Sequence, residues 1–149
     1  DNGRLDIYGT KEDLEYFNAC DKLTVDRPDI SLNDAITPPE VMHKLNGSDF
    51  FVLPTLDENF GHSIIESLAQ GCPVIISDQT PWNDLENFGA GWVISLENQE
   101  RWKEVLSVAS KMDQNEYSRM SARAKEYVEQ KFDFADLREK YLKLFQTEN

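Results

Sequence analysis

The sequence predicts an α/β domain in which helices cover both faces of a parallel β-sheet. Short runs of apolar and β-branched residues alternate along the chain with segments whose apolar residues recur at helical spacing. Two of these runs, at 50–53 and 74–76, contain no polar residue, which is typical of strands buried on both faces. Strands that alternate with helices in this way indicate βαβ units, whose ligands bind beyond the carboxyl ends of the strands.

The first third of the chain is predicted to contain a strand, a helix and a further extended region. The alternating pattern of residues 5–8, followed by a glycine, predicts a strand. Thr10 is a candidate N-cap for a helix over about 11–19, with acidic residues in its first turn. The region that follows offers two candidate short strands and a loop, at 23–25, 29–32 and 33–36.

The middle of the chain begins with a strong helix signal. Thr37 is a candidate N-cap, Pro38 suits the first helical position, and Glu40 stands where a capping box needs its acidic partner. Asn46 and the glycine after it end this helix. Trp82, further along, is expected in the core rather than in the wall of a crevice. The remaining elements are a strand at 50–53, a helix over about 61–70, a strand at 74–76, a helical turn at 80–87, a strand at 92–94, and helices at 98–111, 114–131 and 134–146.

Length and charge limit the classes of protein to consider. The chain has 149 residues, the size of one domain, and its 28 Asp and Glu against 15 Lys and Arg give a net charge of −13. Nucleic-acid binding needs a basic surface that neutralises phosphates, and anionic lipid attracts basic segments. We therefore expect neither a nucleic-acid partner nor a membrane contact for this segment.

The segment after the run at 50–53 has the pattern with the clearest chemical meaning. A buried strand leads into a polar loop and then into a helix that begins at a glycine. The free N–H groups of a helix start bind anions, and glycine removes a Cβ where a phosphate would approach the backbone. The backbone amides expected to face that phosphate are those of Phe60, Gly61, His62 and Ser63.

Two glutamates in this segment are candidate ligands of hydroxyl groups. Glu66 shares with Ser63 and Gln70 the helix face opposite the apolar positions, so it lies about one turn from the anion site. Its carboxylate could accept hydrogen bonds from the two vicinal hydroxyls of a ribose. Glu58, on the loop before the helix, could bind a second hydroxylated group, and Thr55 could cap the loop or line the pocket. The buried face is predicted to consist of Ile64, Ile65, Leu68 and Ala69.

The ordered string of this segment resembles the nucleotide-sugar-binding half of retaining glycosyltransferases with the GT-B architecture, in particular family 4. Their signature is a pair of glutamates with seven residues between them, in the context Pro-Ser/Thr-x-x-Glu-x-Phe-Gly and then Glu-Ala-x-Ala-x-Gly-x-Pro-Val-Ile. Glu58 and Glu66 stand at the positions of the two glutamates, and Ser67 replaces the usual alanine. The strand at 49–54 also resembles this family, and the match extends over about residues 4–146.

This resemblance implies a Rossmann-like three-layer α/β/α domain with a parallel sheet, the C-terminal half of a GT-B enzyme. Such an enzyme moves a sugar from a nucleotide diphosphate sugar to a glycan or lipid-linked acceptor, with retention at the anomeric carbon. Glu58 would be the catalytic residue at the donor sugar, and Glu66 would hold the ribose. The other donor-binding residues would be Thr55, Phe60, Gly61, His62 and Ser63. No metal or other cofactor is expected, because the chain has no Asp-x-Asp motif.

The resemblance also implies that residues 1–149 are a single donor-binding domain that is truncated at its N-terminus. The family's basic pair, which grips the diphosphate, follows a strand that would precede this sequence, and neither Arg4 nor Lys11 fits its motif. The acceptor-binding domain would also be absent, so the fragment alone is expected to be inactive. The family's usual setting implies bacterial polysaccharide synthesis in the cytoplasm, with the inner face of the membrane reached only through the missing domain.

Two other functions remain open at this point. One is a nucleotide-sugar epimerase of the GT-B fold, against which the pair Glu58 and Glu66 favours the transferase. The other is a non-catalytic α/β nucleotide-binding module, such as a receiver. Asp57 follows a strand, as the phosphorylated residue of a receiver would, but the Phe60-Gly61 helix start suits a diphosphate better. No G-x-G-x-x-G follows the first strand, which disfavours classical dinucleotide binding.

Overall fold

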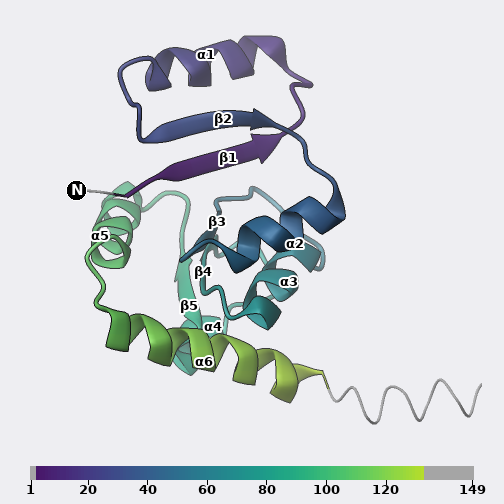
Figure 1. Cartoon of the computed structure of the whole chain (residues 1–149), viewed down its shortest axis with the longest axis vertical. Helices are drawn as coiled ribbons and strands as arrows, with labels where there is room; N and C mark the ends of the chain where they lie inside the picture. Colours follow the sequence, from purple (N-terminus) through teal and green to yellow (C-terminus); the bar gives the residue numbers. More distant parts are fainter. Residues whose placement is uncertain (1–2, 133–149) are drawn as a thin grey trace, which may run out of the picture. The chain divides into compact units, whose positions relative to one another are not determined.

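The computed structural model describes residues 3–132, which alternate parallel strands with helices (Figure 1). The chain divides into two units, Asp1–His43 and Lys44–Asn149, and the division falls within α2 (Pro38–Asn46). The helix predicted at 134–146 lies outside the described residues. Among those residues, no helix is both long and apolar enough to cross a membrane.

The first unit is a βαβ arrangement. Strands β1 (Leu5–Gly9) and β2 (Ile30–Asp34) pair in parallel, with Leu5 opposite Ile30, and α1 (Leu14–Thr24) connects them (Figure 1). None of the residues from 3 to 43 is buried, so this unit contributes no fully enclosed side chain to a core.

Three predictions in this unit are wrong in detail. The helix starts at Leu14 rather than at 11, because the Asp13 carboxylate accepts the Tyr16 N–H and forms the N-cap, whereas the Thr10 hydroxyl donates to Glu12. Residues 23–25 are not a strand: α1 continues through Thr24, and the chain turns before β2. Pairing with β1 also extends β2 through Asp34, into the predicted loop.

The second unit has a three-stranded parallel sheet in the order β3-β4-β5. Its strands are β3 (Phe51–Leu53), β4 (Val74–Ser77) and β5 (Gly91–Ile94). Its helices after α2 are α3 (His62–Gln70), α4 (Leu85–Phe88), α5 (Gln99–Ala109) and α6 (Gln114–Lys131), all labelled in Figure 1. Within each unit the described strands pair in parallel, as predicted, but they form two separate hydrogen-bonded sheets.

Alternate residues of β4 build a hydrophobic core on each face of the three-stranded sheet. On one face, Val74 and Ile76 pack with side chains of α3, α4 and α6, including the fully buried Leu85. On the other face, Ile75 packs with Val105 of α5. This alternation confirms the predicted three-layer α/β/α arrangement within the second unit.

The helices after β4 follow the prediction with one exception. The predicted helical turn at 80–87 forms only its last part as helix, because α4 begins at Leu85. Before it, the Thr80 hydroxyl accepts the Trp82 N–H at 3.3 Å, which is a local turn rather than a helical bond. Helices α5 and α6 confirm the predictions at 98–111 and 114–131 to within about two residues at each end.

Asp84, immediately before α4, links that helix to α6. The Tyr127 hydroxyl donates to Asp84 Oδ1 at 2.5 Å, and the Lys131 ammonium donates to Asp84 Oδ2 at 2.6 Å. The hydrogen bond from Lys131, and to a smaller extent the one from Tyr127, holds the pKa of the Asp84 carboxyl below its usual range. Burial, together with the bond to Asp84, raises the pKa of the Tyr127 hydroxyl.

We expect Asp84→Asn to destabilise the second unit at neutral pH and to destabilise it less at pH 3. A carboxyl whose pKa is lowered by folding stabilises the fold above its unfolded pKa, near 3.8, and loses that contribution as pH falls through the folded value. The side chain is 55% exposed, so solvent screening keeps the effect below about 1 kcal/mol. Urea unfolding, with tryptophan fluorescence as the signal, measures the loss of stability. Glu129→Gln, at an exposed position of α6, is the control. Equal losses at both pH values would contradict the assignment to this carboxylate.

Candidate functional site

The predicted site residues lie on α3 and on the loop that joins β3 to it, within the second unit. Thr55 opens this loop: its hydroxyl donates to the Asp57 carbonyl at 2.7 Å and accepts the Asp57 N–H at 3.3 Å. The structure therefore shows that Thr55 caps the loop, which is one of the two roles considered for it.

Gly61 sets the start of α3. It is the N-cap residue and has left-handed backbone angles, with φ 78° and ψ 57°. A Cβ at this position would lie 2.8 Å from Ile64 Cδ1 and 3.1 Å from Trp82 Nε1, so a side chain here would strain the backbone and displace these neighbours. The Gly61 carbonyl accepts the Ile64 and Ile65 amides, and the amides of His62 and Ser63 therefore precede the first bonds of the helix.

The Glu58 side chain occupies part of the predicted anion site. Its Oε1 accepts the Phe60 N–H at 3.2 Å and the Gly61 N–H at 2.9 Å. A carboxylate at this place is favoured by the positive end of the α3 dipole. Two of the four amides predicted to face a phosphate are thus bonded to Glu58, and those of His62 and Ser63 are the two that remain at the helix start.

Glu66 lies on the exposed face of α3, as predicted, and His62 is also exposed. The buried face differs from the prediction at two positions: Ser67 is buried and Ala69 is exposed. Burial of Ser67 is possible because its hydroxyl donates to the Cys72 carbonyl at 2.9 Å. Ile64 and Leu68 are fully buried and anchor the helix to the core.

The last residue of β4 and the segment after it also contribute to the site, through contacts that the sequence pattern did not reveal. The Ser77 hydroxyl donates to the Thr55 carbonyl at 2.6 Å, and the Glu58 N–H donates to the Gln79 carbonyl at 3.1 Å. The Trp82 indole N–H donates to the Phe60 carbonyl at 2.5 Å. The signal available in the sequence was indirect: adjacent parallel strands end at the same edge of a sheet, so their loops meet.

Aromatic rings surround the start of α3. The Phe60 ring lies 4.7 Å from the His62 ring and 5.7 Å from the Trp82 ring, measured between centroids. Phe60 is 40% exposed, whereas Trp82 is 8% exposed and belongs to the core, as predicted.

Within residues 3–132, no group of three His, Cys, Asp or Glu side chains is arranged as a metal site would be.

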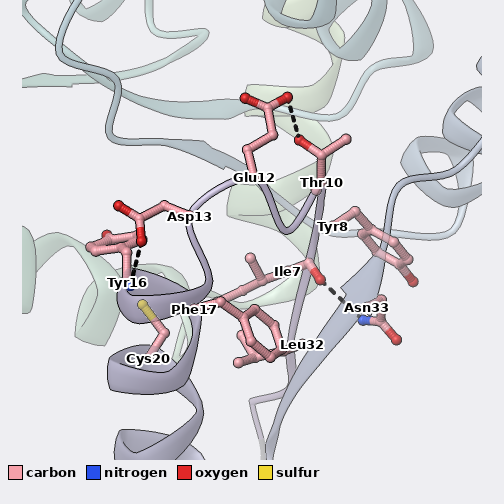
Figure 2. Close-up of a pocket in the computed structure, with 11 residues that line it drawn as sticks. Ile7, Tyr8, Thr10, Glu12, Asp13, Tyr16, Phe17, Cys20, Leu32 and Asn33 are labelled. Atoms are coloured by element: carbon pink, nitrogen blue, oxygen red, sulfur yellow. Dashed lines mark hydrogen bonds between the residues drawn. The ribbon is translucent and has the colours of Figure 1, made fainter.

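A separate pocket of about 220 Å³ lies in the first unit, at the carboxyl ends of β1 and β2 (Figure 2). Its apolar lining includes Ile7, Phe17 and Leu32. Polar groups around it bond to one another: Thr10 to Glu12, the Tyr16 N–H to Asp13, and Asn33 to the Ile7 carbonyl, as Figure 2 shows. None of the seven predicted site residues lines this pocket.

Comparison with known proteins places the chain in one family. The sequence profile of the family described as glycosyl transferases group 1 matches residues 2–127. This span includes all the residues of the predicted site. No curated protein matches the sequence significantly.

Three solved structures similar to this chain have the same fold. WaaG, a glycosyltransferase involved in lipopolysaccharide biosynthesis, matches with a TM-score of 0.74 and 20% identity, over 97% of this chain and 38% of WaaG. TarM matches with a TM-score of 0.72 and 20% identity, over 97% of this chain and 29% of TarM. Alr3699/HepE of Anabaena, in complex with UDP-glucose, matches with a TM-score of 0.74 and 14% identity, over 97% of this chain and 41% of that protein. The chain therefore spans well under half the length of each of these proteins.

Proposed function

Because the chain belongs to the glycosyl transferases group 1 family, we propose that it forms the donor-binding part of a glycosyltransferase. The complete enzyme moves a sugar from a nucleotide diphosphate sugar to a glycan or lipid-linked acceptor, with retention at the anomeric carbon. This chain supplies the C-terminal half of a GT-B architecture. The observation that carries the proposal is the start of α3, where Glu58 binds the Gly61 amide and Glu66 follows on the exposed face of the helix.

Each group at this helix start has a chemical task in the proposal. The amides of His62 and Ser63, at the positive end of α3, bind the diphosphate and stabilise the charge that develops on it as the sugar leaves. The exposed carboxylate of Glu66 accepts hydrogen bonds from the ribose hydroxyls. Glu58 binds the donor sugar and is the catalytic residue of the chain. Thr55 and Phe60 complete the donor site, and the reaction needs no metal.

The rest of the enzyme lies in the part of the protein that this chain does not span. The related structures are more than twice its length, so we propose that the acceptor site and a basic pair for the diphosphate belong to other segments. On its own, the chain is then a weak donor-binding domain without turnover. We further propose that the enzyme acts in bacterial polysaccharide synthesis, in the cytoplasm.

Titration with nucleotide sugars tests the proposal. We expect UDP-, GDP- or ADP-sugars to shift the backbone amide resonances of residues 58–66 in at least one titration. Glu66→Ala should weaken that donor about tenfold or more, because a carboxylate that binds two hydroxyls contributes about 1.5–3 kcal/mol or more. The exposed Glu129→Ala on α6 is the matched control and should leave the affinity unchanged.

Two results would count against the donor site. One is the absence of any shift in residues 58–66 with all three donor classes, both in this chain and in the full-length protein. The other is an equal loss of affinity in Glu66→Ala and Glu129→Ala, since the loss would then not depend on the carboxylate beside the proposed site. A purely regulatory nucleotide-binding module would bind the nucleotide as tightly as the nucleotide sugar, so titration with the nucleoside diphosphate alone completes the comparison.

A further inference from the structure

One peptide group at the start of α3, between Phe60 and Gly61, is held from both sides. Its carbonyl oxygen accepts the indole N–H of Trp82 at 2.5 Å, and its N–H donates to Glu58 Oε1 at 2.9 Å. A peptide group is planar, so its C=O and N–H point in opposite directions and move together. Fixing the oxygen therefore fixes the direction of the N–H that binds Glu58.

The Trp82 indole is itself held in place. It is 8% exposed, and its ring lies against Tyr127 and Phe132 at centroid distances of 6.3 Å and 6.2 Å, in addition to Phe60. The backbone N–H of Trp82 donates to the Thr80 hydroxyl at 3.3 Å. Because the ring is buried among other aromatic rings, it has little freedom to turn, and its N–H is aimed at the Phe60 carbonyl before any ligand arrives.

We propose that Trp82 is a positioning residue of the donor site. It acts through the Phe60–Gly61 peptide, which in turn orients the Glu58 carboxylate and the first amides of α3. This inference rests on the proposed function for its donor, but the contact itself exists in the free chain and can be tested there. Phenylalanine at position 82 would keep an aromatic ring in the core and remove the N–H, but it also removes part of the ring, so the test needs a control that loses the same atoms.

The chain offers a matched control for this substitution. Trp102, on α5, also donates its indole N–H to a backbone carbonyl, that of Ser95, at 3.1 Å. It lies with the core on the other face of the sheet, away from the start of α3. Trp82→Phe and Trp102→Phe thus remove the same kind of bond from the same unit, and only the first should change the donor site.

Amide hydrogen exchange of the ligand-free chain is the first measurement. We expect the exchange rate of the Gly61 amide to rise about tenfold in Trp82→Phe, relative to amides in the middle of α6, and to stay unchanged in Trp102→Phe. A rate that does not change in Trp82→Phe, or that rises equally in both variants, would overturn the proposal because the peptide would not depend on Trp82.

Donor affinity is the second measurement, made with the nucleotide sugar that binds the wild-type chain. We expect Trp82→Phe to weaken it about fivefold to tenfold, and to have at most a twofold effect in a Glu58→Ala background, which has no side-chain acceptor for the Gly61 amide, since both residues act on one peptide. An equal effect of Trp82→Phe in both backgrounds would show that Trp82 acts on general stability. If no donor binds the wild-type chain or the full-length protein, the proposed function fails, whereas the Gly61 exchange rate still shows whether Trp82 holds the peptide.

Discussion

Gly91→Ala is expected to lower the free energy of unfolding of the second unit by more than about 3 kcal/mol, the range of severe steric defects in a core. Gly91 is buried at the start of β5, where it pairs with Val74 of β4. A Cβ at this position would overlap the Val74 carbonyl oxygen and lie 2.9 Å from Leu85 Cδ2. The obstacle is the backbone of the adjacent strand, which cannot rotate away as a side chain can, so the two strands would have to separate.

Gly89→Ala is the control for this experiment. Gly89 ends α4 with φ 79°, and a Cβ there would meet no heavy atom within 4 Å. Its substitution therefore carries only the left-handed backbone cost, about 1–2 kcal/mol. All three tryptophans of the chain, at 82, 92 and 102, lie in the second unit, so urea unfolding followed by fluorescence reports on that unit. A loss in Gly89→Ala as large as that in Gly91→Ala would show that the close approach of β4 does not decide the effect.

Ile64→Ala is expected to destabilise the second unit by about 2–5 kcal/mol and to loosen the donor site with it. Ile64 has no exposed surface and packs in the core beneath α3, and its N–H is bonded to the Gly61 carbonyl. Its Cδ1 also lies 2.8 Å from where a Cβ of Gly61 would stand, so the side chain packs against the turn that starts α3. Removing three carbon atoms leaves a cavity at the point where the helix start meets the core.

The next residue on the same helix is the control for this second prediction. Ile65 is only partly buried against the core, so Ile65→Ala should cost about half as much. Urea unfolding by tryptophan fluorescence compares the two variants, and the amide spectrum of residues 58–66 shows whether the site changes with the core. Equal losses of stability, or an unchanged spectrum in Ile64→Ala, would contradict this account of α3.

Much of the fold was predictable because local patterns encode it. The apolar runs at 50–53 and 74–76 became β3 and β4, and alternate residues of β4 face opposite cores. The helix signal at Thr37 was also correct: the Glu40 carboxylate accepts the Thr37 N–H at 2.7 Å, as in a capping box. These features depend on residues at most a few positions apart, and such contacts form wherever the segment is placed.

The sequence predictions were wrong where two nearby residues could both start a helix, or where a segment distant in the sequence determines the length of a strand or the burial of a residue. Thr10 and Asp13 are both good N-cap residues, and only the bond from the Tyr16 amide shows that Asp13 starts the helix. The length of β2 depends on how far β1 continues beside it. On α3, Ser67 is buried because the carbonyl that accepts its hydroxyl belongs to Cys72, beyond the end of the helix.

By itself, the sequence determined the alternation of strands and helices, the helix start at Gly61 and the family pattern that includes Glu58 and Glu66. Only the tertiary structure showed that Glu58 binds the Phe60 and Gly61 amides and that Trp82 holds the other side of the same peptide. The physical reason is separation along the chain. Hydrophobic periodicity states which side of an element is buried, but the bond from Trp82 joins residues 22 positions apart, and only the meeting of two loops at one edge of the sheet creates it.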